Sequence, residues 1–185
     1  MAAVIMACPA CTPDKPPSAP TSTPVPMRRP VPDRSPYLCY FIPEAAVAEL
    51  TGYTGPYKAG SAKRDPDGYG CVISNDEQSL FITSYDVSAS QKLIENFTEF
   101  GKNRNPVKLP EELGTGEISD FETRLYPYRK AGVWFRCGSD NSLITIVVKR
   151  NPVRDQDHDL IQLMQIAQRR FAEMFKCKLG GPPPG

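Results

Sequence analysis

Apolar and polar residues alternate in several short stretches of the chain, a pattern typical of half-buried β-strands. These stretches are residues 68–74, 79–87, 118–126, 131–137 and 142–150. Turn-forming residues at 75–78 join the first two stretches and predict an antiparallel hairpin. A second turn-rich connection, 138–141, joins the last two. Residues 103–116 are loop-rich and predict at most one short strand.

Apolar positions spaced three and four residues apart predict three helices. The first covers residues 42–52, because Pro43 suits the first turn of a helix and Gly52 suits its end.

The second predicted helix follows Ser88, which forms a capping box with Gln91, and it ends near Gly101. The third and strongest helix is capped by Asp155 or Asp157. Its apolar stripe consists of Leu160, Leu163, Met164, Ala167, Phe171, Met174 and Phe175.

The order of helices and strands predicts a single α+β domain over residues 37–179, with helices packed on an antiparallel sheet. Residues 9–36 are rich in proline, serine and threonine and lack hydrophobic periodicity, which predicts a disordered spacer. Residues 180–185 form a second, short disordered tail, and residues 1–8 are interpreted below.

Charge and hydropathy argue against nucleic-acid binding and against a membrane-spanning helix. The 185 residues include 22 basic and 21 acidic side chains, so the formal net charge is +1 and no positive surplus indicates nucleic-acid binding. No apolar run approaches the roughly 20 residues that a membrane-spanning helix needs. We therefore expect no nucleic-acid partner and no transmembrane helix.

Six cysteines define the redox chemistry of the chain. Cys8 and Cys11 form a CxxC-like pair, but no second pair has zinc-site spacing, and we expect no metal. The other four are Cys39, Cys71, Cys137 and Cys177.

These four cysteines suit two disulfides in an oxidising compartment, the alternative being four buried free thiols in a cytosolic protein. Three pairings are open. We favour Cys39–Cys71 and Cys137–Cys177, because each pair joins a helix region to a nearby strand region.

The first residues contain a candidate lipid-attachment site. Ile5-Met6-Ala7-Cys8 has the order of a lipobox: a branched apolar residue, a tolerant position, a small residue and the cysteine that is acylated. Cys11 fits worse, because Cys8 and Pro9 occupy the positions before it. Since residues 1–7 lack a basic region and a full apolar segment, we expect residues 1–8 to be the remnant of a longer lipoprotein signal peptide.

Catalytic patterns are weak. Neighbouring carboxylates occur at Glu111-Glu112, at Asp65 and Asp67, and at Asp76-Glu77, all in turn-like surroundings. The single histidine, His158, lies in an acidic helix start without a predicted partner. We expect no catalytic residue and no cofactor.

Several short motifs carry a family resemblance. Residues 39–52, followed by Gly70-Cys71-Val72-Ile73 and by Leu113-Gly114-Thr115-Gly116, resemble the uncharacterised secreted lipoproteins of actinobacteria, with their C-x-Leu-Leu…Leu-x-Gly…Gly-Cys-x-Trp pattern. Ile73 stands where that family has tryptophan or another aromatic residue. The resemblance implies a lipid-anchored protein on the outer face of the cytoplasmic membrane and a disulfide-bonded α+β domain. It implies no enzymatic activity.

The leading hypothesis is a membrane-anchored cell-envelope lipoprotein with a non-catalytic, ligand-binding or protein-binding domain, which could serve as a sensor. One alternative is an envelope hydrolase that uses acidic residues. A second is a cytosolic interaction module with a proline-rich arm. The ligand, the partner and the oligomeric state do not follow from the sequence.

Overall fold

A computed structural model describes residues 25–64, 68–90, 104–122 and 127–181. The helices are α1 (Glu44–Thr51), the short 3-10 helix η1 (Glu111–Leu113) and α3 (Gln156–Phe175). The strands are β1 (Tyr37–Leu38), β2 (Ile42–Pro43), β3 (Lys58–Arg64), β4 (Gly68–Ser74), β5 (Ser79–Asp86), β6 (Arg104–Lys108), β7 (Thr115–Glu122), β8 (Pro127–Cys137), β9 (Asp140–Lys149) and β10 (Leu179–Gly180).

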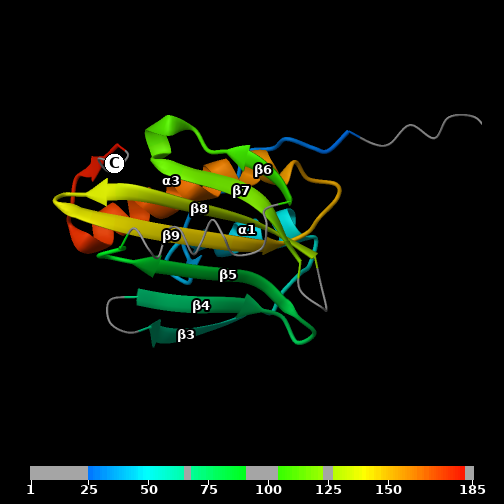
Figure 1. The fold of residues 1–185 in the computed structure, drawn as a ribbon. Coiled ribbons are helices and arrows are strands. Elements are labelled where there is room, and N and C mark those ends of the chain that lie inside the picture. Colours follow the sequence, from blue (N-terminus) through cyan, green and yellow to red (C-terminus); the bar gives the residue numbers. More distant parts are fainter. Residues whose placement is uncertain (1–24, 65–67, 91–103, 123–126, 182–185) are drawn as a thin grey trace, which may run out of the picture.

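The described residues form an α+β fold built on one large antiparallel sheet, as the sequence predicts. Seven of its eight strands follow the order β3-β4-β5-β9-β8-β7-β6, and β10 pairs with the end of β8. Strands β1 and β2 pair separately. Figure 1 shows α1 and α3 behind the sheet, both on the same side. We call this side the helix face and the opposite side the outer face.

The helix face is apolar because alternate residues of the central strands point toward α3. In β9 these residues are Ile144, Ile146 and Val148, all fully or almost fully buried. From α3, Phe171 is completely buried, and its ring lies 5.4 Å from Phe135 of β8. Burial of each such side chain stabilises the fold by about 1.5–3 kcal/mol.

Both predicted ends of α1 are explained by backbone geometry. Pro43 precedes the helix as its N-cap, where its missing N–H leaves no helical hydrogen bond unmade. Gly52 ends the helix in the left-handed conformation, with φ 78°, which glycine adopts without steric strain. The helix begins two residues later than the predicted range 42–52, because Ile42 and Pro43 pair in β2.

The two predicted disulfides are confirmed. Cys39 and Cys71 have Cα atoms 5.6 Å apart and join the segment before α1 to β4. Cys137 and Cys177 have Cα atoms 5.3 Å apart and join the end of β8 to the segment after α3. Each disulfide thus links a segment next to a helix to the sheet on which that helix packs.

Residues 25–36, which the sequence assigns to the spacer, pack along α3. The side chain of Val31 is 6% exposed and belongs to the core, and its backbone N–H donates to Gln162 Oε1 at 3.0 Å. Arg28 forms an ion pair with Asp155 at 2.7 Å. The folded unit thus extends upstream of the predicted domain start. It also includes Gly180, predicted as tail, which pairs with β8.

Other boundaries differ from the sequence expectations as well. Strands β3 and β6 come from segments without clear alternation, and β8 begins at Pro127 rather than at residue 131. Residues 89 and 90 are not helical, although the predicted second helix follows Ser88. The backbone N–H of Ala89 instead donates to Asn141 in the β8–β9 hairpin. Residues 91–101 of that predicted helix lie outside the described residues.

Removing either disulfide by cysteine replacement should destabilise the fold. The paired cysteines are 32 and 40 residues apart in the sequence. Because each disulfide restricts the unfolded chain, it should contribute about 3–4 kcal/mol to the free energy of unfolding. We expect the double variants Cys39→Ser/Cys71→Ser and Cys137→Ser/Cys177→Ser each to lower the free energy of unfolding by this amount. Urea denaturation followed by circular dichroism measures the loss. An unchanged midpoint for both variants would contradict a stabilising role.

Candidate functional site

A groove on the outer face is the main candidate for a functional site. It has a volume of about 570 Å³ and is formed by residues of β3, β4, β5 and β9. Its lining includes Gly60, Gly70, Val72, Ile82, Ser84 and Thr145. The volume lies in the range of pockets that hold small ligands or individual side chains of a partner.

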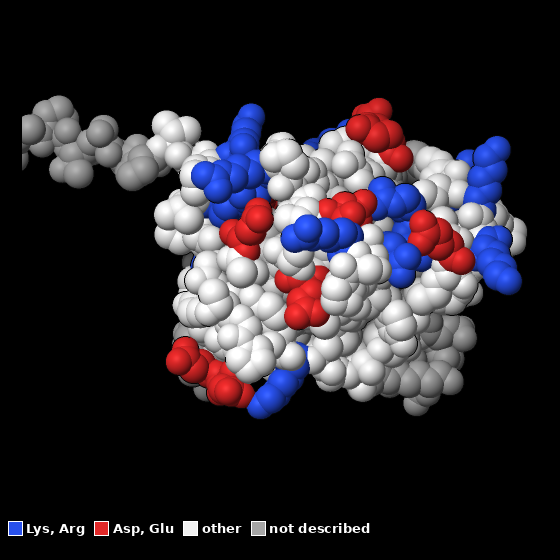
Figure 2. Space-filling view, turned by 180° about the vertical axis from the view of Figure 1, so that it is seen from behind, with Lys and Arg blue, Asp and Glu red and all other residues white. Residues whose placement is uncertain are grey.

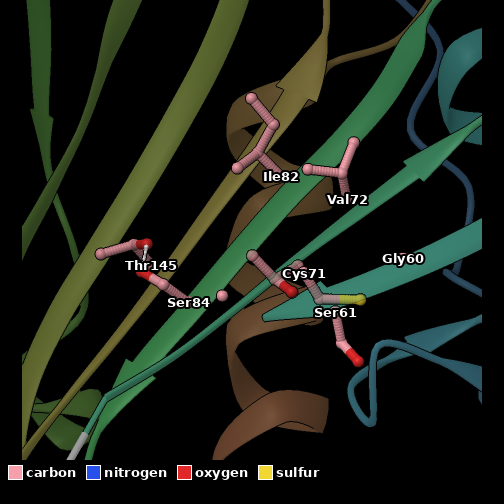
Figure 3. Close-up of a pocket in the computed structure, with 9 residues that line it drawn as sticks. Gly60, Ser61, Cys71, Val72, Ile82, Ser84 and Thr145 are labelled. Carbon is pink, nitrogen blue, oxygen red and sulfur yellow. Dashed lines mark hydrogen bonds between the residues drawn. The ribbon is translucent and has the colours of Figure 1, made fainter. Parts of the chain in front are cut away.

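The walls of the groove are apolar. Val72 and Ile82 are register partners on β4 and β5, so their side chains project from the same face of the sheet. Figure 3 shows them side by side at one end of the groove. The side chain of Val72 is 36% exposed, which leaves an apolar surface in contact with solvent.

Two glycines line the groove next to these walls. Gly60 of β3 pairs with Val72, and Gly70 of β4 pairs with Ser84. A Cβ atom placed on Gly60 would meet no heavy atom within 4 Å, so the space above β3 is open. The missing side chain of Gly60 leaves room beside Val72 for the side chain of a ligand.

A pair of hydroxyl groups supplies the polar side of the groove. Ser84 Oγ and Thr145 Oγ1 lie 2.6 Å apart on paired positions of β5 and β9 (Figure 3). One hydroxyl donates to the other, so the second hydroxyl proton is left for another acceptor. Among the described residues that line the groove, no side chain is a carboxylate, an amine or an imidazole, and Cys71 is held in its disulfide. The described lining therefore offers apolar contacts and hydroxyl groups to a bound molecule.

A second, polar pocket of about 350 Å³ lies at the start of α3. Arg129 is buried there, and it donates to Asp157 Oδ1 at 2.7 Å, to Asp120 Oδ1 at 3.0 Å and to the carbonyl oxygen of Asn105 at 3.0 Å. Arg150 also pairs with Asp120. Basic and acidic side chains are interspersed on the helix face (Figure 2).

The charged side chains at this end of the molecule, which we call the polar cluster, pair with one another and connect neighbouring strands and helices. Its members are Asp120, Arg129, Arg150, Arg154, Asp157 and Asp159. Arg154 and Asp159 form a buried two-contact ion pair, at 2.6 and 3.0 Å, and Arg154 also donates to the backbone carbonyl of Arg29. Arg154 therefore ties the N-terminal segment to α3. Because each of these arginines faces a carboxylate, we assign the cluster a structural role.

Asp120 is the best-connected carboxylate of the polar cluster. Burial opposes its ionisation, but hydrogen bonding from Asn105 and the charges of Arg150 and Arg129 outweigh this effect and hold its pKa below the ordinary value. Asp120 is therefore ionised throughout the neutral range, and its charge compensates that of buried Arg129.

Two of the three neighbouring carboxylate pairs lie within the described residues, and each has a member in an ion pair of its own. Glu111 pairs with Lys108 at 2.9 Å and Asp76 pairs with Lys58 at 2.6 Å, both on the exposed surface. Asp65 and Asp67 lie outside the described residues. Within residues 25–64, 68–90, 104–122 and 127–181, no group of three or more metal-ligating side chains is found.

The structure describes the surroundings of His158 but not those of Cys8. His158 lies in the first turn of α3, where its backbone N–H donates to the capping carboxylate of Asp155 and its ring contacts Gln162. Asp155 is therefore the cap, one of the two residues predicted for that role. Cys8, the candidate lipid-attachment residue, lies outside the described residues, as does Cys11.

Sequence reasoning predicts β4, β5 and β9 but not the groove between them. The groove depends on β3, whose sequence KAGSAKR shows no apolar alternation, and on the pairing of β5 with β9. Gly60 and Gly70 on neighbouring strands are the only sequence signal for open space, and it becomes visible only when their register is known.

No family model, curated protein or solved structure matches this chain. The resemblance to actinobacterial lipoproteins therefore stays a prediction. None of the helices within the described residues is long and apolar enough to cross a membrane.

Filling the groove tests whether it binds apolar molecules. We expect the wild-type protein to enhance the fluorescence of 1-anilinonaphthalene-8-sulfonate, and Gly60→Trp to abolish most of the enhancement by occupying the space beside Val72. Gly181→Trp is the matched control, because Gly181 also faces open space but lies outside the groove lining. Equal fluorescence from both variants would show that the dye binds elsewhere.

The polar cluster makes the stability depend on pH. Since the pKa of Asp120 is lower in the folded chain than in the unfolded chain, its ionisation stabilises the fold above about pH 4, and this contribution is lost as the pH falls further. Asp120→Asn should lower the free energy of unfolding at pH 7 by about 1–3 kcal/mol. The difference from wild type, measured by urea denaturation, should shrink at pH 3. A difference that stays constant between these pH values would refute the assignment.

Proposed function

We propose that this protein is a cell-envelope lipoprotein, anchored to the membrane through Cys8, whose disulfide-bonded domain binds a ligand in the outer-face groove without transforming it. The groove carries this proposal, because its described residues combine apolar walls at Val72 and Ile82 with one hydroxyl pair. Sites of this composition bind by burying apolar surface and orient the ligand by a few hydrogen bonds.

The disulfides support an extracytoplasmic location. Structural disulfides persist in oxidising compartments and are rare in the reducing cytosol. Both bonds here connect segments at the ends of helices to the sheet, and Cys39, Cys71 and Cys137 are buried. Such placement is typical of structural rather than transient disulfides.

The direction in which the chain enters the domain is compatible with an anchor. Residues 25–33 run beside α3, near β6, whereas β3 forms the opposite edge of the sheet (Figure 1). An anchor upstream of residue 25 would hold the domain from the side of β6. The groove beside β3 would then face away from the attachment point.

Two alternatives make different predictions. An envelope hydrolase needs two carboxylates that converge on one pocket and are free to react. In the described residues, Glu111 and Asp76 are engaged in separate surface ion pairs. Asp155 and Asp157 do line the polar pocket, but they pair with Arg28 and Arg129. A cytosolic interaction module needs its cysteines reduced, whereas the fold places Cys39 next to Cys71 and Cys137 next to Cys177 at bonding distance.

Replacement of Cys8 tests the anchor. In the native host, we expect the wild-type protein in the membrane fraction, with an intact mass increased by the lipid, and Cys8→Ala in the soluble fraction without that increase. Cys11→Ala is the matched control and should stay in the membrane fraction, because the lipobox order precedes Cys8. Soluble, unacylated wild-type protein with free thiols would rule out the proposal.

A further inference from the structure

Three exposed apolar side chains lie where the described chain enters the domain. Val25 and Val153 are 87% and 56% exposed, which makes them the most exposed large apolar residues of the described chain, and Met27 is 41% exposed. The backbone N–H of Met27 donates to the carbonyl oxygen of Val153 at 2.9 Å, and Val25 is only two residues upstream. Exposed apolar side chains that gather in one place indicate a contact surface.

Two basic side chains adjoin these apolar residues. Arg28 and Arg29 follow Met27 directly, and both are exposed. Arg28 pairs with Asp155, yet its side chain remains 72% exposed, whereas Arg29 forms no ion pair with any residue of the described chain. Figure 2 shows basic side chains at the end of the domain where the described chain begins. We call the surface formed by these exposed residues the chain-entry surface: Val25, Met27, Arg28, Arg29 and Val153.

The charge balance around the chain-entry surface is positive. Residues 25–36 contain three arginines and one aspartate, Asp33. Asp33 pairs with Arg169, and Arg28 pairs with Asp155, so the segment and these two partners combine four arginines with two aspartates. In the neighbouring polar cluster, three carboxylates match three arginines. These groups together therefore carry a surplus of positive charge, which an anionic surface would balance.

The position of the chain-entry surface favours a membrane as its partner. Residues 9–24, which separate Cys8 from Val25, reach at most about 55 Å. A lipid anchor at Cys8 would therefore hold the surface within reach of the bilayer and raise its effective concentration there. The interface of a bilayer accepts apolar side chains at the level of its headgroups, and anionic lipids attract arginine. The chain-entry surface offers both kinds of group.

We propose that the chain-entry surface contacts an anionic phospholipid membrane, with its three apolar side chains at the level of the headgroups and its two arginines beside the lipid phosphates. This inference rests on the proposed membrane anchor and adds a contact that the domain itself makes. The contact orients the domain: β6 and the start of α3 lie toward the membrane, whereas β3 and the groove lie at the far edge of the sheet (Figure 1).

The test uses the full-length chain with Cys8→Ala, so that binding does not depend on an attached lipid. Sedimentation with vesicles measures its partition onto phosphatidylcholine alone and onto phosphatidylcholine that contains about 30% phosphatidylglycerol. We expect partition onto the anionic vesicles to be at least fivefold higher, because each basic residue near anionic lipid contributes to binding. Partition should fall at least threefold when the salt concentration rises from about 0.05 to about 0.3 M, since salt screens this attraction.

Matched variants localise the contact. Arg29→Glu and Val25→Asp should each lower partition onto the anionic vesicles at least threefold. Lys178→Glu and Leu179→Asp make the same kinds of change at exposed positions beyond the opposite end of α3, and they should leave the partition unchanged. Because the side chains of Arg29 and Val25 are exposed, we expect both variants to keep the wild-type midpoint in urea denaturation.

The outcomes separate this inference from the proposed function. Equal partition onto the two kinds of vesicle, no partition onto either, or equal losses in all four variants would overturn the contact. A mass that doubles with protein concentration, and returns to that of one chain in Val25→Asp, would assign the surface to self-association and overturn it as well. If the wild-type chain then still enters the membrane fraction through Cys8, the anchor stands without the contact. Soluble, unacylated native protein would overturn the proposed function, whatever the vesicles show.

Discussion

The packing of α3 against one face of the sheet is the constraint on which the rest of the structure depends. Phe171 lies fully buried between Phe135 and Tyr85, with ring distances of 5.4 and 5.6 Å. This contact determines which side chains of β8 and β9 point inward, because the strand period of two leaves no other choice once one face is buried. The Cys137–Cys177 disulfide then holds the end of the helix against β8. The outer-face groove is a consequence: it forms from the residues that alternate away from α3.

The two ends of the sheet serve different purposes. At the start of α3, buried Arg129 and Arg154 are matched by carboxylates, and the N-terminal segment is fastened there through Arg28 and the backbone of Arg29. Removing one partner from a buried ion pair costs far more than a surface pair contributes, so this end resists change. At the other end, no described strand pairs with the outer side of β3, which lies beside the apolar groove.

The sequence predicts the secondary structure well where the pattern is strong. Alternation in residues 142–150 matches β9. The predicted apolar stripe matches the buried face of α3 from Leu160 to Phe171, whereas Met174 and Phe175 are exposed. Gly52 marks the end of α1 because only a left-handed residue closes the helix there. The proline, serine and threonine content of residues 9–36, without hydrophobic periodicity, predicts a spacer, whereas the segment 25–36 packs along α3. Its packing depends on single contacts, such as that of Val31 with Gln162, which have no periodic signature.

By itself, the sequence determined the α+β class and the positions of the central strands and the last helix, because these depend on local periodicity. It left three cysteine pairings open and favoured the one that the structure shows. The tertiary structure alone decided the groove and its edge. Ser84 and Thr145 are 61 residues apart and meet only because β5 lies next to β9. The segment KAGSAKR becomes a strand only through its pairing with β4, since its own residues supply no alternating apolar face. The candidate site therefore depends on long-range strand pairing, because its residues come from separate strands whose order and register local periodicity does not specify.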